Sequence, residues 1–378
     1  MGIYGIMLLK GRIDMRKHFI DNLRWGAVLM LIPYHAAQAF NTWGEPNYVS
    51  FEGSRAICSI IVFMSPWYMP LLFLLAGIST RYSLQKRSRS QYLTERLKRL
   101  GVPLVFGMLT FVPALTYIAE KSRGTFEGGF FEHYSVFFTK LTDWTGADGG
   151  FSMGQFWFLL YLLVISAAAV GITTLQKKLT ERPAPVLPFP AVILLGAPLP
   201  LLSEVLSVGG KSLAEFLYIF LVGYYIFSDD RIIEKAAKYR FITLPAGIIA
   251  GIADVYLFVW SGTEHPALNT AAKFVCEWCM VLGLMGLGKN RLDLSNKFTA
   301  HMSSRSMSFF GYHFIWVVLF QYLMAGAFEG NTAMLYFVPA AAAYAATFIC
   351  CEITARLPVL GFLMGERYRK REETTHRQ

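Results

Sequence analysis

Apolar residues recur along almost the whole chain in runs close to the length of a transmembrane helix. Such a helix needs about 20 mainly apolar residues. The fifth run is rich in proline and is expected to be kinked or broken. The pattern predicts an all-α, polytopic integral membrane protein of about ten transmembrane helices, at residues 20–40, 56–78, 101–119, 154–174, 186–204, 213–228, 241–260, 268–288, 307–326 and 333–354.

Composition agrees with a single membrane domain. Hydrophobic residues make up 54% of the 378 positions and charged residues 16%, and the mean hydropathy is +0.42. We divide the chain into a basic N-terminal segment (1–19), a transmembrane domain (20–354) and a basic tail (355–378). Met15 competes with Met1 as the natural start, because "MRKHFIDNLR" reads as a complete basic lead into the first span.

The distribution of positive charge predicts the orientation. Cytoplasmic loops of membrane proteins are enriched in Lys and Arg. If both termini are cytoplasmic, 28 of the 35 Lys and Arg residues fall on inner segments and 5 on outer segments. The net charge of +10 is therefore explained without nucleic acid as a partner. The domain is expected to be multi-pass in the cytoplasmic (inner) membrane.

The five cysteines all lie in apolar runs, where a disulfide framework is not expected. Cys276 and Cys279 form a C-x-x-C motif, but no further Cys or His ligand is near them in the sequence. We interpret the motif as packing rather than as a metal or redox site, and we expect no metal.

Two loops carry more than a connection requires. The outer loop 120–153 contains "GGFFEHYSVFFTKL", whose aromatic spacing predicts a short amphipathic helix on the membrane surface or a lid over a site. The inner loop 79–99 is the most basic segment of the chain. It either contacts lipid headgroups or binds a polyanionic cofactor, and its composition alone leaves both open.

The first span, "LRWGAVLMLIPYHA" from Leu23 to Ala36, carries two ionisable side chains in an apolar context. Arg24 and His35 are eleven residues apart, which on an α-helix is about 16 Å and three near-complete turns, so both lie on one face. Arg24 alone could reach the headgroups, but His35 lies deeper and needs a partner or a wet cavity. Pro33 removes a helix hydrogen bond close to it.

This pair suits acyl transfer from a nucleotide-bearing thioester to an alcohol. A histidine can accept the proton of an attacking hydroxyl, and an arginine can bind phosphate or carboxylate bidentately. The alternative structural role of His35 is a packing histidine bonded to a neighbouring helix.

Several segments, in order, resemble the membrane acyltransferase-3 family. "FIDNLRWGAVLMLIPYH" is similar to the family's opening signature, an Arg and a His separated by ten residues. "MPLLFLLAGIST" with Gly77, "YLTERLKRLGVPLVFG" with Arg96 and Arg99, "FWFLLYLLVIS" and "SMSFFGYHFIWVV" resemble later landmarks. The first half also resembles the glucan-succinylating branch. One departure is Gln155, which stands where the family often has a His before the fourth-span Trp.

The resemblance implies an acyl-CoA donor (acetyl-CoA or succinyl-CoA) and a hydroxyl of a cell-envelope carbohydrate as acceptor, with membrane lipids around the domain. His35 is then the expected general base and Arg24 binds or orients the donor. Arg96 and Arg99 become candidate ligands of the CoA phosphates, and His313 either helps to orient the donor or caps a packed helix.

A transporter of a small or anionic solute is the alternative function, with Arg24, His35, Lys273 and Glu277 lining its path. Lys273 and Glu277 are four residues apart and could pair on one helix face. Transporters commonly have repeated halves, and this chain shows no convincing repeat. The resemblance to the acyltransferase-3 family decides for the enzyme.

Overall fold

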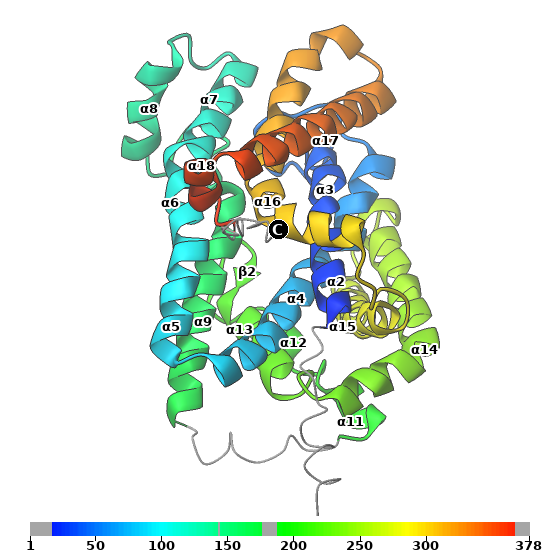
Figure 1. Cartoon of the computed structure of the whole chain (residues 1–378). Coiled ribbons are helices and arrows are strands. Elements are labelled where there is room, and N and C mark those ends of the chain that lie inside the picture. The colour runs from blue at the N-terminus through cyan, green and yellow to red at the C-terminus, as the bar shows by residue number, and fades with distance from the viewer. Residues whose placement is uncertain (1–16, 143, 176–186, 367–378) are drawn as a thin grey trace, which may run out of the picture.

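The protein is described by a computed structural model that covers residues 17–142, 144–175 and 187–366. The alternative start at Met15, the basic residues of the 175–185 loop beyond Leu175, and most of the basic tail lie outside these residues. In the described part of the chain the regular elements are helices apart from one two-stranded hairpin (Figure 1). Its elements are α2 (His18–Leu29), α3 (Leu31–Gln38), α4 (Arg55–Lys86), α5 (Arg89–Arg96), η1 (Leu97–Gly101), α6 (Val102–Leu109), α7 (Phe111–Arg123), α8 (Phe130–Thr139), η2 (Gly154–Phe156), α9 (Trp157–Leu175), α11 (Phe189–Leu194), α12 (Leu199–Leu202), β1 (Ser207–Val208), β2 (Lys211–Ser212), α13 (Leu213–Tyr225), α14 (Asp230–Val255), η3 (Tyr256–Trp260), α15 (Pro266–Arg291), α16 (Lys297–Met324), η4 (Gly326–Phe328), α17 (Thr332–Arg356) and α18 (Pro358–Leu363).

The all-α membrane architecture is confirmed. Within the described residues, seven helical segments are long and apolar enough to cross a bilayer: Arg55–Lys86, Arg89–Arg123, Gly154–Leu175, Asp230–Trp260, Pro266–Arg291, Lys297–Met324 and Thr332–Arg356. The other three predicted spans are helical but shorter or divided, as α2 with α3, α11 with α12, and α13. Ten spans and cytoplasmic termini therefore stay predictions.

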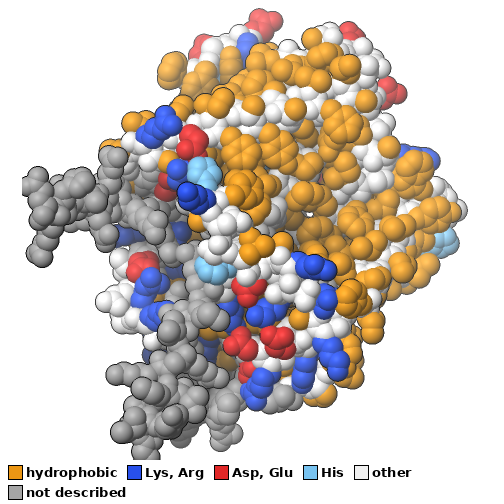
Figure 2. Space-filling model, turned by 45° about the vertical axis from the view of Figure 1, so that its right-hand side comes forward, with side chains coloured by type: hydrophobic (Ala, Val, Ile, Leu, Met, Phe, Trp, Pro, Cys, Tyr) orange, Lys and Arg blue, Asp and Glu red, His pale blue; other side chains and the backbone are white. Residues whose placement is uncertain are grey.

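Figure 2 shows hydrophobic side chains covering most of one face of the molecule, with charged side chains gathered towards one end. Large apolar side chains that are exposed include Ile249 and Ile252 of α14 and Phe337 and Ile349 of α17. In water such a surface would be costly, whereas lipid chains solvate it at no penalty. The side chains are thus arranged for a bilayer.

The first predicted span divides at Met30, between α2 and α3. Pro33 has no N–H with which to bond the carbonyl of Leu29, and that carbonyl instead accepts a hydrogen bond from the Tyr344 hydroxyl at 2.7 Å. The Pro33 carbonyl accepts another from the Tyr336 hydroxyl at 3.3 Å. Neighbouring α17 thus satisfies backbone groups that the proline exposes, as membrane interiors require.

Helices α4 and α13 cross with their backbones in close contact. A Cβ on Gly77 would lie 2.0 Å from the Phe220 carbonyl oxygen, and one on Gly223 would lie 2.3 Å from the Leu74 carbonyl oxygen. Small residues at such crossings let membrane helices approach closely. The ring of Phe73 stacks on Phe216 with centroids 4.5 Å apart. These contacts fix α13, and with it the hairpin that precedes it, against the core of the bundle.

The predicted short helix in the outer loop is present as α8. Its inner face holds His133, which is fully buried and lies 3.1 Å from a carboxylate oxygen of Glu120 on α7. Lys140, just after α8, lies 3.6 Å from the other oxygen of the same carboxylate. On the opposite face Phe131 is 88% exposed. The helix is therefore amphipathic and is tied to the end of α7.

Candidate active site

The ring of His35 is oriented by a hydrogen bond at one of its two nitrogens. Its Nδ1–H donates to Oε1 of Gln38 at 2.8 Å, an oxygen that can only accept. The proton therefore sits on Nδ1, and Nε2 carries the free lone pair. Phe314 packs against the ring, with centroids 4.2 Å apart, yet part of His35 stays accessible. The imidazole is therefore held in one orientation by a single hydrogen bond at Nδ1.

His313 lies directly beside His35, with ring centroids 5.2 Å apart. Its Nδ1–H donates to the Phe310 carbonyl at 2.8 Å, and its buried Nε2 has no hydrogen-bond partner. The helix that carries it, α16, begins at Lys297. His313 thus lies mid-helix, at the level of His35.

Arg24 is held near the opposite end of the same span. One guanidinium nitrogen donates to Asp21 at 2.9 Å, one turn earlier on α2. Another donates to the Ser79 hydroxyl of α4 at 2.8 Å. The side chain is only partly buried, so the guanidinium is oriented and still accessible to a ligand.

Arg96 approaches the same end of α4. Its Nε donates to the Tyr92 hydroxyl at 2.9 Å and a second nitrogen donates to the Thr80 hydroxyl at 3.1 Å. Thr80 directly follows Ser79, the partner of Arg24. Two arginines that are far apart in sequence therefore meet adjacent residues of one helix. The side chain of Arg99 is exposed. Its backbone carbonyl packs so closely against Gly365 that a side chain at position 365 would clash with it.

Other predicted polar positions have structural environments. Gln155 is buried, and its amide nitrogen donates to the Gly311 carbonyl at 3.2 Å, which ties α16 to the start of the fourth span. The expected pair between Lys273 and Glu277 is not formed: the Lys273 ammonium lies over the Phe274 ring, and Oε1 of Glu277 has no partner. The physical reason is that Lys273 extends towards the surface while Glu277 is 1% exposed.

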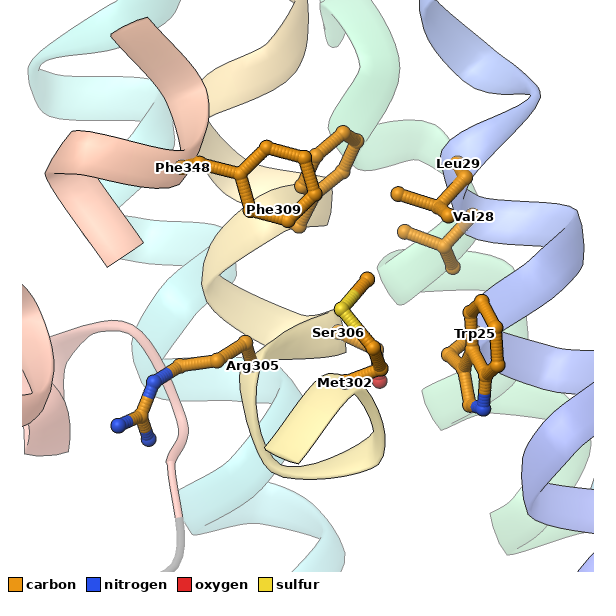
Figure 3. A pocket seen from close by; sticks show the side chains of 8 residues that line it. All are labelled: Trp25, Val28, Leu29, Met302, Arg305, Ser306, Phe309 and Phe348. Carbon is orange, nitrogen blue, oxygen red and sulfur yellow. The ribbon is translucent and has the colours of Figure 1, made fainter. Parts of the chain in front are cut away.

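The structure has two pockets that are lined by residues other than Arg24 and His35. Figure 3 shows Trp25, Val28 and Leu29 of α2 facing residues of α16 and α17 across an apolar slot. Its volume is about 10 Å³, room for a single water at most. A larger hollow of about 540 Å³ lies between the start of α16, the end of α17 and α18, lined by His301 and Arg305 among others. Neither is lined by Arg24 or His35.

No group of three His, Cys, Asp or Glu side chains in the described part of the chain is placed to hold a metal ion. Cys276 and Cys279 are free thiols, as are the other three cysteines.

Sequence reasoning missed Gln38 and Ser79. Gln38 follows His35 by three residues on one helix face, so its spacing was a usable signal. Ser79 was named only as part of the basic loop. Its contact with Arg24 joins residues 55 apart, and no local pattern reveals it.

Known proteins resemble this chain over nearly its whole length. The family model of the acyltransferase domain matches residues 17–356. Glucans biosynthesis protein C of Salmonella typhimurium is 23% identical over 388 residues, which cover 93% of this chain and 94% of that protein. Its counterpart in Salmonella heidelberg is 22% identical over 397 residues, with coverage of 95% and 97%. No solved structure matches the chain.

The family match takes in the Arg24 and His35 span, the basic segment after α4, and the helices up to the end of α17. It thus includes the residues that the structure brings together around His35 and around the end of α4. The chain belongs to the acyltransferase-3 family and is an acyltransferase with several membrane-spanning helices.

Proposed function

We propose that this protein transfers an acyl group from cytoplasmic acyl-CoA to a hydroxyl of a cell-envelope carbohydrate, in the cytoplasmic (inner) membrane. The family match supports the reaction class, and the relatives named for glucan biosynthesis support a carbohydrate acceptor. The observation that carries the proposal is the oriented His35 ring, whose Nδ1–H is bound by Gln38 and whose Nε2 is free to accept a proton.

In this reaction His35 acts as the general base. Nε2 accepts the proton of the acceptor hydroxyl as that oxygen attacks the thioester carbonyl carbon. The tetrahedral intermediate collapses, the C–S bond breaks, and His35 returns the proton to the leaving thiolate, so that an ester and free CoA are formed. His313 packs beside the base and holds its ring in place, a different role from the donor contact expected from sequence.

The donor is bound at the inner end of the same route. Arg24 and Arg96 converge on Ser79 and Thr80, and guanidinium groups bind phosphate through paired N–H donors. We assign the phosphates of CoA to these arginines and to the exposed Arg99. Arg24 is about 16 Å from His35 along the helix, a distance that the flexible arm of CoA spans.

The test is CoA release by the purified protein in detergent, with acetyl-CoA or succinyl-CoA and β-glucan oligosaccharides as acceptor. We expect H35Q to lose about 100-fold or more in kcat and R24M to raise KM for the donor. H265Q is the matched control, because His265 lies in an exposed outer turn against Thr263. Full activity of H35Q, or solute movement in vesicles that depends on His35 without CoA release, would contradict the proposal.

A further inference from the structure

The hollow of about 540 Å³ between α16, α17 and α18 has a cationic wall. Lys297, His301 and Arg305 line it from α16, and because they are spaced four residues apart they lie on one face of that helix. Figure 3 shows the side chain of Arg305 extending from α16 away from Trp25 and the small apolar slot. The volume of the hollow is in the range of ligand-binding sites, and it is large enough for a lipid headgroup.

The positive charges of this wall are only partly neutralised. Nε of Arg305 donates to Oε1 of Glu352 on α17 at 2.9 Å, and Nε2 of His301 lies 3.1 Å from the same oxygen. One carboxylate oxygen therefore serves two side chains. Within the described residues, the Lys297 ammonium makes no hydrogen bond or ion pair, and Nη2 of Arg305 donates to nothing. Two cations thus have N–H groups available to a bound anion.

Glu366 is the acidic residue among the side chains that line the hollow. The Ser308 hydroxyl donates to Oε1 of its carboxyl group at 2.6 Å. Burial raises the pKa of Glu366, which favours the uncharged carboxylic acid. The hollow therefore keeps an excess of positive charge.

Another part of the lining is apolar. Leu357, Pro358 and Phe362 line the hollow from the segment that contains α18, and the side chains of Leu357 and Phe362 are exposed. The hollow lies where α16 begins and α17 ends, and both helices are long and apolar enough to cross a bilayer. It is therefore close to the boundary between lipid hydrocarbon and headgroups. Cations beside exposed apolar side chains at this depth suit an amphiphile with an anionic headgroup.

We infer that this hollow binds the headgroup phosphate of an anionic phospholipid through Arg305 and Lys297, with the lipid's acyl chains against the exposed side chains of α18. Basic pockets between transmembrane helices bind acidic headgroups in this way. A free phosphate ion would use the cationic wall alone and leave the apolar wall uncovered, whereas a phospholipid covers both. The inference is independent of the proposed acyl transfer, because neither Arg24 nor His35 lines the hollow.

The test is native mass spectrometry of the full chain released from nanodiscs that contain equal amounts of dioleoylphosphatidylglycerol and dioleoylphosphatidylcholine. We expect the wild type to retain phosphatidylglycerol in preference. K297M and R305M should each weaken that retention about 5-fold, the contribution of one basic residue at an anionic lipid surface. K297M breaks no contact within the described part of the chain, whereas R305M leaves Glu352 with one cation fewer. Thermal unfolding of R305M in lipid-free detergent checks that it is folded.

The matched control is K238M, which removes an exposed lysine of α14 that lies over the Tyr239 ring and does not line the hollow. It should retain phosphatidylglycerol as the wild type does. Unchanged retention by K297M and by folded R305M would overturn the inference, and so would a wild type that retains both lipids equally. Displacement of the lipid by millimolar inorganic phosphate or by CoA would also overturn it, because the hollow would then belong to a free anion or to the acyl donor.

Discussion

At the scale of single residues, the decisive contact is the hydrogen bond between His35 and Gln38. A neutral imidazole has one donor and one acceptor nitrogen, and its hydrogen-bond partner decides which is which. Gln38 binds Nδ1–H at 2.8 Å, so Nε2 is the nitrogen that carries the lone pair. Without that bond the ring can rotate or change tautomer, and Nε2 is then the base only part of the time.

We therefore expect Q38L to lower kcat without changing KM for acyl-CoA. General base catalysis contributes roughly 10²- to 10⁴-fold, and loss of orientation should cost about 10-fold of it. Steady-state kinetics of CoA release separate the two parameters. Q38E supplies the control, because its carboxylate oxygen still accepts from Nδ1–H and should retain most of the activity. A higher KM with an unchanged kcat would place Gln38 in donor binding instead.

At the scale of elements, close helix crossings set the position of the site. Gly77 and Gly223 bring α4 and α13 into backbone contact, and this crossing positions both Ser79 and the hairpin of β1 and β2. The sequence marked Gly77 as a family landmark, but a glycine in an apolar run does not name its partner. The division of the first span was also indicated by Pro33, whereas the carbonyl partners on α17 are more than 300 residues away and have no local signal.

G77A is expected to destabilise the protein. A methyl group there would lie 2.0 Å from the Phe220 carbonyl oxygen, so the helices must move apart, at a cost of roughly 1–3 kcal/mol. Thermal unfolding in detergent should show a clearly lower Tm. G171A in α9 is the control, because a Cβ there meets nothing within 4 Å and alanine favours a helix over glycine. Equal Tm values for the two variants would refute the crossing.

At the scale of the whole molecule, the two ends have different chemistry. Arg24 and Arg96 gather at one end of α4, and α8 lies at the other end of the molecule (Figure 1). The patterns of hydropathy and charge predicted the helical membrane fold, because each apolar run by itself indicates a membrane environment. They did not predict that His313 lies beside His35, because that contact depends on which helices pack together. The sequence thus singled out His35 and Arg24, and the fold added the residues that pack and bond to them.

The orientation that the charge distribution predicts can be tested with single cysteines in exposed positions. If both termini are cytoplasmic, Ser135 of α8 and Ser207 of the hairpin face outward, and Ser90 of α5 faces the cytoplasm. A membrane-impermeant maleimide should therefore label S135C and S207C in intact spheroplasts, and S90C only after permeabilisation. The unsubstituted chain gives the background, since its five thiols are buried or partly buried. Labelling of S90C alone in intact spheroplasts would reverse the orientation, placing Arg24 outward and removing the route for cytoplasmic acyl-CoA. Labelling of S207C from the outside would place the hairpin on the side from which a carbohydrate acceptor arrives, so that donor and acceptor approach His35 from opposite faces of the membrane.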